Sequence, residues 1–431
     1  MILRHTLPFA CLLGLTTSFA FAIPALAHPQ LTEAAARTTA PEKIVELDPP
    51  AEIPQGIRVK RLRFELRSVE TPEGPVATEI YAFLAIPEGK GPFPGILVLH
   101  GGGGHAEEAK AIGWAQRGYV AIAPDLPGIA KPEAAAESRG AWKASYAFGR
   151  WRVQPDVTND AIFEAVLTGL SAFKILQTQP EVDRSRLGIV GISWGGYMTT
   201  ILTGLLGDQV AASFSVFGSG HYDKATFASA LNKLSEADRK TWMENLDAAR
   251  YAPNMKATYF VAAAANDSFF FPPAVQATLN DIPSAKNLVF APNADHKTSF
   301  PGGRPQGVET NWAAQEVDFF NYLLKGEGQP LPTVKVTQPT PDERRAVRFH
   351  VDSKTLLKDV SIQITNSEGP WKGRKWEKIP ATDLGDGNYE AFIPEPLLTD
   401  GFWYALVTDD RPTSVSSLIT PLGTADLNRV P

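Results

Sequence analysis

The stretch Leu187-Gly188-Ile189-Val190-Gly191-Ile192-Ser193-Trp194-Gly195-Gly196 decides the fold of this chain. Its apolar first half is typical of a buried strand, and residues 197–206 after it are typical of a helix. Between them stands Gly-x-Ser-x-Gly, whose small residues let a strand and a helix approach closely across a sharp turn. A short pattern of this kind also occurs by chance in ordinary turns. With these flanks, however, it predicts a nucleophile at Ser193 and an oxyanion donor at the backbone amide of Trp194.

Short apolar runs and helical patterns alternate on both sides of this turn. We expect helices over 107–117, 156–177, 272–281 and 308–325, and buried strands over 95–99, 119–123, 187–192, 210–217, 256–264 and 287–291. The alternation predicts the α/β class, with a doubly wound, mostly parallel sheet that binds ligands at the carboxyl ends of its strands. Two earlier runs, 59–69 and 76–86, flank a Pro-Glu-Gly-Pro turn and predict an antiparallel hairpin at a sheet edge.

The 431 residues are too many for a single core of ordinary size. Residues 327–332 have the composition of a linker, and beyond them the apolar period becomes two. We therefore expect a catalytic α/β domain over 58–326 and a small β-sandwich over 333–431. The strands expected in the sandwich are 347–351, 359–365, 389–393, 403–408 and 415–420.

The first part of the chain has the features of a secretory signal peptide. Residues 1–27 hold an early positive charge, an apolar run and the small-x-small cleavage site Ala25-Leu26-Ala27. An uncleaved membrane anchor is the alternative, but Pro8 and the cleavage site argue against it. Residues 28–57 are rich in Ala, Pro, Glu and Thr and predict a flexible leader. The expectation is a periplasmic or extracellular protein with no stable membrane insertion after cleavage.

Charge and cysteine content exclude several kinds of partner and of metal site. The formal net charge is −6 and the chain has no basic block, so we expect no nucleic-acid partner. The one cysteine, Cys11, lies inside the expected signal peptide, which leaves no disulfide and no cysteine-based zinc site in the remainder. We expect neither a cofactor nor a metal, and the sequence leaves the oligomeric state open.

A serine nucleophile needs a base at neutral pH. Three histidines follow Ser193. His296 comes directly after the last strand expected in the sheet, which is the position the chain order Ser, acid, His requires. His221 comes too early and is expected either to line the cleft or to be an ordinary loop residue. His350 falls inside an expected sandwich strand and is interpreted as structural.

The base in turn needs a carboxylate that orients it. Asp267 directly follows the strand 256–264, and one helix and one strand separate it from His296, so it is the first choice. Asp295 is the neighbour of His296, and adjacent side chains seldom make the required bond. Asp281 stands at an expected helix end and not directly after a strand, so it is a weaker candidate than Asp267.

The loop His100-Gly101-Gly102-Gly103-Gly104 follows the strand 95–99 and predicts the second half of an oxyanion hole. Its glycines free the backbone to direct amides at a substrate oxygen, with Gly102 as the first choice of donor and Gly103 as the second. A phosphate-binding loop is the alternative, but the Gly-Lys-Ser/Thr ending is missing. His100 is expected to stabilise the loop.

Several motifs resemble the α/β-hydrolase family. They are the strand and loop from Pro94 to Gly104, Arg117-Gly118-Tyr119-Val120-Ala121, Pro180-Glu181-Val182-Asp183-Arg184 and the Ser193 turn, with Arg374-Lys375-Trp376-Glu377 and Thr408-Asp409-Asp410-Arg411 in the small domain. Within the family the chain is similar to secreted bacterial acetylxylan-esterase-like proteins, neighbours of dienelactone hydrolases and prolyl-oligopeptidase-type enzymes. The resemblance covers residues 59–420. The segment 221–251 departs from it by its length and is expected to cap the cleft.

The resemblance implies a serine carboxylic-ester hydrolase that works through an acyl-enzyme. Its substrate would be a small ester or an acetylated carbohydrate, such as acetylated xylan or an oligosaccharide. A prolyl-oligopeptidase-type serine peptidase is the first alternative, and a glycan-binding protein with a degenerate hydrolase domain is the second.

Two groups of aromatic residues have two interpretations each. Either group could stack on sugar rings, but we favour core or interface packing for both. The groups are Trp142, Tyr146, Phe148 and Trp151 near the expected cleft, and Trp371, Trp376 and Trp403 in the sandwich.

Overall fold

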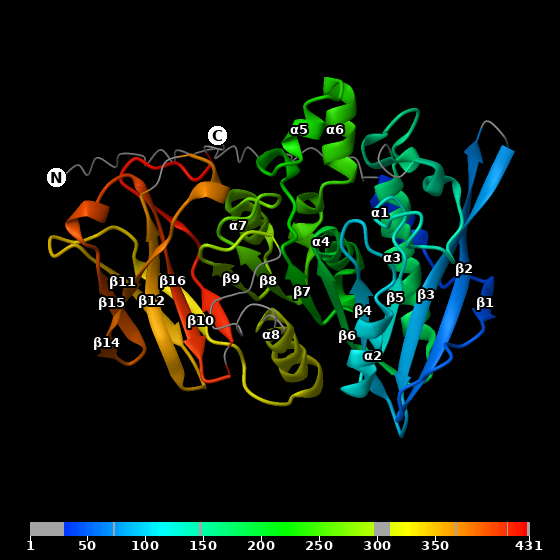
Figure 1. The fold of residues 1–431 in the computed structure, drawn as a ribbon, viewed down its shortest axis with the longest axis horizontal. Helices are drawn as coiled ribbons and strands as arrows, with labels where there is room; N and C mark the ends of the chain where they lie inside the picture. The colour runs from blue at the N-terminus through cyan, green and yellow to red at the C-terminus, as the bar shows by residue number, and fades with distance from the viewer. Residues whose placement is uncertain are drawn as a thin grey trace, which may run out of the picture.

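A nine-stranded sheet forms the centre of the larger part of the molecule (Figure 1). The computed structural model describes residues 30–71, 74–145, 149–296, 311–366, 369–411 and 413–428. The strand order is β1-β2-β3-β5-β4-β6-β7-β8-β9. The strands are β1 (Ile44–Leu47), β2 (Ile57–Thr71), β3 (Gly74–Pro87), β4 (Phe93–Leu99), β5 (Val120–Pro124), β6 (Val182–Ile192), β7 (Ala212–Val216), β8 (Thr258–Ala264) and β9 (Lys286–Ala291).

The strands from β5 to β9 are parallel, while β1, β2 and β3 form an antiparallel edge. Strands β5 and β7 are buried along their whole length, which explains their uninterrupted apolar sequence. The order reverses at β4, because β5 lies on one side of it and β6 on the other. Ligands in doubly wound sheets bind where the order reverses, beyond the carboxyl ends of the strands. The predicted doubly wound, mostly parallel sheet is therefore confirmed, and the reversal places the site after β4 and β6.

Helices cover both faces of the sheet (Figure 1). On one face Trp114 of α2 packs edge-on against Phe320 of α8 at 5.4 Å between ring centroids. On the other face α3 contacts α4, and the hydroxyl groups of Thr200 in α4 and Tyr259 in β8 are 2.8 Å apart. The main helices are α2 (Glu108–Gln116), α3 (Ala161–Thr178), α4 (Trp194–Leu206), α7 (Pro272–Asp281) and α8 (Asn311–Phe320).

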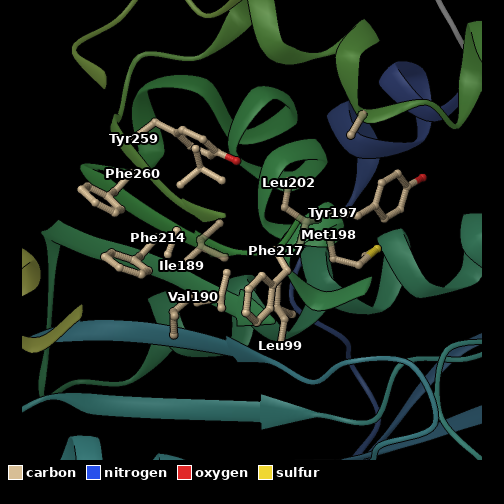
Figure 2. Close-up of a cluster of buried hydrophobic side chains, with 14 of the residues drawn as sticks. Leu99, Ile189, Val190, Tyr197, Met198, Leu202, Phe214, Phe217, Tyr259 and Phe260 are labelled. Atoms are coloured by element: carbon tan, nitrogen blue, oxygen red, sulfur yellow. The ribbon is translucent and has the colours of Figure 1, made fainter. Parts of the chain in front are cut away.

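The core beside the Ser193 turn is shown in Figure 2. Phe214 and Phe260, from neighbouring parallel strands, stack at 4.7 Å between ring centroids, and Phe319 of α8 meets Phe214 edge-on at 5.5 Å. Met198 and Leu202 of α4 are fully buried. Packing on both faces of β6 to β8 therefore fixes the strand that carries Ser193.

Helix α3 begins later than the sequence predicted. Asp160 accepts a hydrogen bond from the amide of Ile162 at 2.8 Å and so caps the helix at Ala161 instead of near residue 156. Within the described residues α3 is also the one helix whose length and apolar composition would suit a membrane span. Because 78% of that window is buried in the protein, it has the environment of a core helix.

The expectation of a flexible leader over 28–57 differs from the structure. This segment holds α1 (Gln30–Arg37) as well as β1, whose Ile44 pairs with Phe64 of β2. Leu31 is fully buried, and the amide of Gln30 donates to Asn245 Oδ1 at 2.9 Å. One buried leucine and one strand pairing hold a segment whose overall composition is polar. The expected signal peptide, residues 1–27, lies outside the described residues.

The C-terminal part consists of two antiparallel sheets, which confirms the expected small β-sandwich region (Figure 1, orange and red). One has the order β10-β11-β15-β14; the other has β13-β12-β16-β17, with β18 also on β16. The strands are β10 (Thr333–Gln338), β11 (Ala346–Asp352), β12 (Leu357–Thr365), β13 (Glu377–Pro380), β14 (Thr382–Gly385), β15 (Asn388–Phe392), β16 (Gly401–Asp409), β17 (Ser414–Ser416) and β18 (Thr420–Leu422). The sequence did not predict β10, β13, β14 or β18. These strands have three to six residues each, and nearly all of those residues are half-buried or exposed.

This part packs against the outer edge of the large sheet. Strand β17 contacts β9, and the amide of Phe290 in β9 donates to Ser416 Oγ at 3.0 Å. At the opposite end of β9, Asn287 Nδ2 donates to the carbonyl oxygen of Pro332 at 2.7 Å.

Candidate active site

The turn between β6 and α4 holds Ser193 in a backbone conformation that serines rarely adopt, with φ 58° and ψ −119°. Its amide donates to the carbonyl oxygen of Val216 at 2.7 Å, which ties the turn to β7. A Cβ atom on Gly191 would lie 2.3 Å from the carbonyl oxygen of Gly195, and one on Gly195 would lie 2.2 Å from that of Leu99. The motif's glycines are therefore required by backbone contacts on two sides.

Ser193, His296 and Asp267 meet at the carboxyl end of the sheet, as predicted. His296 Nε2 lies 2.9 Å from Ser193 Oγ, and His296 Nδ1 lies 3.0 Å from Asp267 Oδ2. These distances are within the hydrogen-bond range that proton transfer between a nucleophile and its base needs. The three side chains come from the turns after β6, β8 and β9, so the parallel sheet brings together residues far apart in the chain.

Asp267 is fixed more tightly than its sequence position alone suggests. Its side chain is only 1% exposed, and Oδ1 accepts hydrogen bonds from the amides of Phe269 at 2.7 Å and Phe270 at 2.9 Å. The carboxylate has these two amides and the imidazole of His296 as partners, so it is held in one orientation.

The two weaker carboxylates make other contacts. Asp295 Oδ1 accepts from the amide of Ser268 at 2.8 Å, and Asp281 Oδ2 lies 2.7 Å from His221 Nε2. His221 is thus paired at the C-terminal end of α7. It is not among the residues that line the pocket at Ser193.

Of the remaining histidines weighed from the sequence, His350 lies in β11 with Nδ1 3.2 Å from Asn388 Oδ1, away from the Ser193 turn. His100 is buried; its Nδ1 lies 2.8 Å from the carbonyl oxygen of Gly101, and its Nε2 accepts from the amide of Leu126 at 2.9 Å. Burial lowers the pKa of His100 from 6.5 to about 4, so the ring is neutral near pH 7. A neutral ring donates at one nitrogen and accepts at the other, as these contacts require, and it stabilises the glycine loop.

That loop lies against the Ser193 turn. A Cβ atom on Gly102 would come within 2.7 Å of the Trp194 ring, so the loop backbone approaches the start of α4 closely. The amide of Trp194 is in the first turn of α4 and has no intrahelical acceptor. The prediction of Gly103 as a second oxyanion donor is wrong, because its amide already donates to the carbonyl oxygen of Ile129 at 2.8 Å. Of the two loop amides predicted as donors, that of Gly102 therefore remains the candidate.

A pocket of about 390 Å³ opens above Ser193. Its walls are mostly aromatic and aliphatic, and they include Phe227 from the insertion 221–251, which the sequence predicted as a cap. The helices of that insertion, α5 (Ala228–Leu231) and α6 (Glu236–Asn245), project above the sheet in Figure 1. Arg150 is the cation of the lining, with its guanidinium 4.9 Å from the centre of the Trp194 ring. The complete lining of described residues is Gly101, Gly102, Arg150, Ile192, Ser193, Trp194, Phe217, Phe227, Phe269 and His296.

A model of the dienelactone hydrolase family matches residues 80–317, which include every residue of this site. The chain belongs to the dienelactone hydrolase family. A search of the curated proteins gave no match for this family member.

Solved structures similar to this dienelactone hydrolase family member include two acetyl xylan esterases. Acetyl xylan esterase 1 from a Thermoanaerobacterium species aligns over 68% of this chain and 98% of its own, with 17% identity and a TM-score of 0.53. The acetyl xylan esterase from a Paenibacillus species aligns over 68% and 92%, with 16% identity and a TM-score of 0.52. At these identities the likeness shows the fold alone, that of an α/β-hydrolase.

The aromatic residues with two interpretations pack in the core of this family member, as far as the structure describes them. Trp142 is buried, and Trp151 packs on Trp242 of the insertion at 4.9 Å between ring centroids. Tyr146 and Phe148 lie outside the described residues. In the C-terminal part all three tryptophans are buried, namely Trp371, Trp376 and Trp403.

Sequence reasoning missed the pocket residues Arg150, Phe227 and Phe269. Arg150 and Phe227 belong to connections between core elements, and no local pattern distinguishes them from other surface residues. Phe269 had a usable signal, because it stands two residues after the predicted acid Asp267 and must therefore lie beside the site.

Proposed function

We propose that this dienelactone hydrolase family member is a serine carboxylic-ester hydrolase, with Ser193 as nucleophile, His296 as general base and acid, and Asp267 as the orienting carboxylate. The observation that carries the proposal is the unbroken series of contacts from Ser193 Oγ through the imidazole to Asp267, at 2.9 and 3.0 Å, on the floor of a pocket. A strained turn, a base and an orienting acid in this arrangement suit acyl transfer.

In the proposed reaction Ser193 Oγ attacks the ester carbonyl carbon while His296 Nε2 takes the hydroxyl proton. The amides of Trp194 and Gly102 stabilise the negative oxygen of the tetrahedral intermediate. The bond to the alkoxy oxygen then breaks, and His296 returns the proton to the departing alcohol. A water molecule, deprotonated by His296, then attacks the acyl carbon. The bond from that carbon to Ser193 Oγ breaks, His296 returns the proton to Oγ, and the carboxylic acid leaves the regenerated serine.

For the substrate we propose an acetyl ester of a carbohydrate. The shared fold with the two acetyl xylan esterases supports this choice. So does Phe269, which is 45% exposed and whose ring lies 4.9 Å from that of His296. Because His296 protonates the departing alcohol, Phe269 borders the alcohol side of the pocket, where an aromatic face can stack on a sugar ring. We also propose export through the signal peptide at residues 1–27, since its composition fits that role.

The test is hydrolysis of p-nitrophenyl acetate and acetylated xylan by the purified protein and by Ser193→Ala. The variant should lose turnover of both esters and labelling by a fluorophosphonate. Ser185→Ala is the matched control, because Ser185 stands on the same strand at its exposed end. Undiminished activity of Ser193→Ala would refute the assignment. Cleavage of aminoacyl-naphthylamides without cleavage of esters would favour a peptidase, and glycan binding without labelling would favour a binding protein.

A further inference from the structure

Two asparagines next to the proposed triad residues extend their side chains into the C-terminal β-sandwich. Asn266 immediately precedes Asp267 in the turn after β8, and Asn293 lies three residues before His296 in the turn after β9. Both side chains bond to backbone atoms of one short segment, residues 371–376. The sandwich therefore bonds to the turn that carries Asp267 and to the turn that carries His296, in each case through an asparagine side chain.

The contacts of Asn266 are short and shielded from water. Its Nδ2 donates to the carbonyl oxygen of Trp371 at 2.9 Å and to that of Arg374 at 2.6 Å. The residue is only 4% exposed. One side-chain amide therefore joins two carbonyl groups of the segment, and removing it would take a donor from each of them.

Asn293 makes a reciprocal pair with Trp376. Its Nδ2 donates to the carbonyl oxygen of Trp376 at 2.8 Å, and its Oδ1 accepts from the amide of Trp376 at 2.8 Å. The backbone of Asn293 is left-handed, with φ 55°, which asparagine tolerates better than most residues. The side chain thus pairs with a backbone as a neighbouring strand would.

The two turns are joined to each other and the segment is anchored on its own side. The amide of Asn266 donates to the carbonyl oxygen of Ala294 at 3.0 Å, so a shift of one turn moves the other. In the sandwich Trp371 is buried against Phe402 at 5.1 Å between ring centroids, and Trp376 packs on Tyr404 at 4.9 Å. Residues 371–376 are therefore held in place by the sandwich core and can support both turns.

We propose that Asn266 and Asn293 are positioning residues, through which the β-sandwich holds the Asp267–His296 half of the site in register with Ser193. This inference rests on the proposed ester hydrolase. The Ser193 half has its own support, because the Ser193 amide donates to Val216 within the large sheet. Only one contact, from His296 Nε2 to Ser193 Oγ at 2.9 Å, couples the two halves in the triad itself. A displacement of about 1 Å at such a contact can reduce a rate on the order of a hundredfold.

The test compares Asn266→Ala and Asn293→Gly with Asn287→Ala, all in the full chain. Glycine at 293 keeps the left-handed backbone without strain and removes only the side-chain bonds. Asn287 is a matched control on β9, since its side chain also donates to a backbone carbonyl outside the large sheet, that of Pro332 just before β10, at 2.7 Å. It lies at the end of the strand far from the site. Each variant is assayed on p-nitrophenyl acetate and followed by urea unfolding.

The expected result is a kcat about ten- to a hundredfold lower for Asn266→Ala and Asn293→Gly, with KM within about twofold of the original and slower fluorophosphonate labelling. Asn287→Ala should lose stability to a similar degree and keep its kcat. Two positioning variants give two chances that one folds well enough to assay. If Ser193→Ala is inactive and either asparagine variant folds but keeps a kcat within twofold of the original, the inference is overturned. Full activity of Ser193→Ala would instead overturn the proposed function beneath it.

Discussion

Replacing Gly195 with alanine has two opposing effects on stability: alanine favours the helix, but its Cβ would clash with nearby backbone atoms. Gly195 is in the first turn of α4, where alanine would ordinarily stabilise a helix by about 0.5–1 kcal/mol. Here the new Cβ would lie 2.2 Å from the carbonyl oxygen of Leu99 and 2.7 Å from that of His100. Both neighbours are backbone atoms at the end of β4 and cannot rotate away. Overpacking of this kind costs about 1–3 kcal/mol or more, so the net change should be a loss of about 1–2 kcal/mol.

Urea unfolding of Gly195→Ala measures this loss. Gly113→Ala in α2 is the matched control, because its new Cβ would meet only the far end of the Arg117 side chain, at 3.3 Å. That variant should gain up to about 1 kcal/mol. Gly195→Ala should also lower kcat/KM for p-nitrophenyl acetate, since the displaced backbone leads into Gly102. A Gly195→Ala protein as stable as the original would refute the claim that close backbone approach requires the glycine.

Three further predictions concern the site and its support. Asp267→Asn should lower kcat roughly 10³- to 10⁴-fold with a fold intact by circular dichroism, because an amide cannot stabilise the imidazolium. Phe269→Ala should raise KM for acetylated xylose about three- to tenfold and leave kcat nearly unchanged, whereas Phe392→Ala, equally exposed in β15, should change neither. The pKa of about 4 for buried His100, against 6.5 when unfolded, means that the unfolded chain binds this proton first as the pH falls. Stability from this group is complete above pH 6.5 and declines by up to about 3 kcal/mol by pH 4, so His100→Asn should flatten that part of a urea-unfolding pH series.

The sequence was sufficient where a residue's role follows from its place after a buried strand. Ser193, Asp267 and His296 could be proposed together because β6, β8 and β9 are apolar runs that end at those turns. A parallel sheet brings such ends to one edge, so the meeting of the three side chains follows from topology.

The sequence was insufficient where the deciding contact is long-range. Leu31 holds α1 in place through burial, although the composition around it is that of an unstructured leader. Gly103 looks equivalent to Gly102 until Ile129, from a distant loop, accepts its amide. Asn266 and Asn293 look like ordinary turn residues, because their partners lie about a hundred positions along the chain and form no local pattern.

The contact between β17 and β9 has a consequence for how the protein behaves in solution. An uncovered outer strand presents free amides and carbonyls on which another molecule's strand can assemble. The sandwich shields β9 from this, since Ser416 Oγ occupies the amide of Phe290. A chain cut after residue 326 would thus expose an apolar strand edge, and we expect it to aggregate from dilute solution while the intact protein stays dispersed.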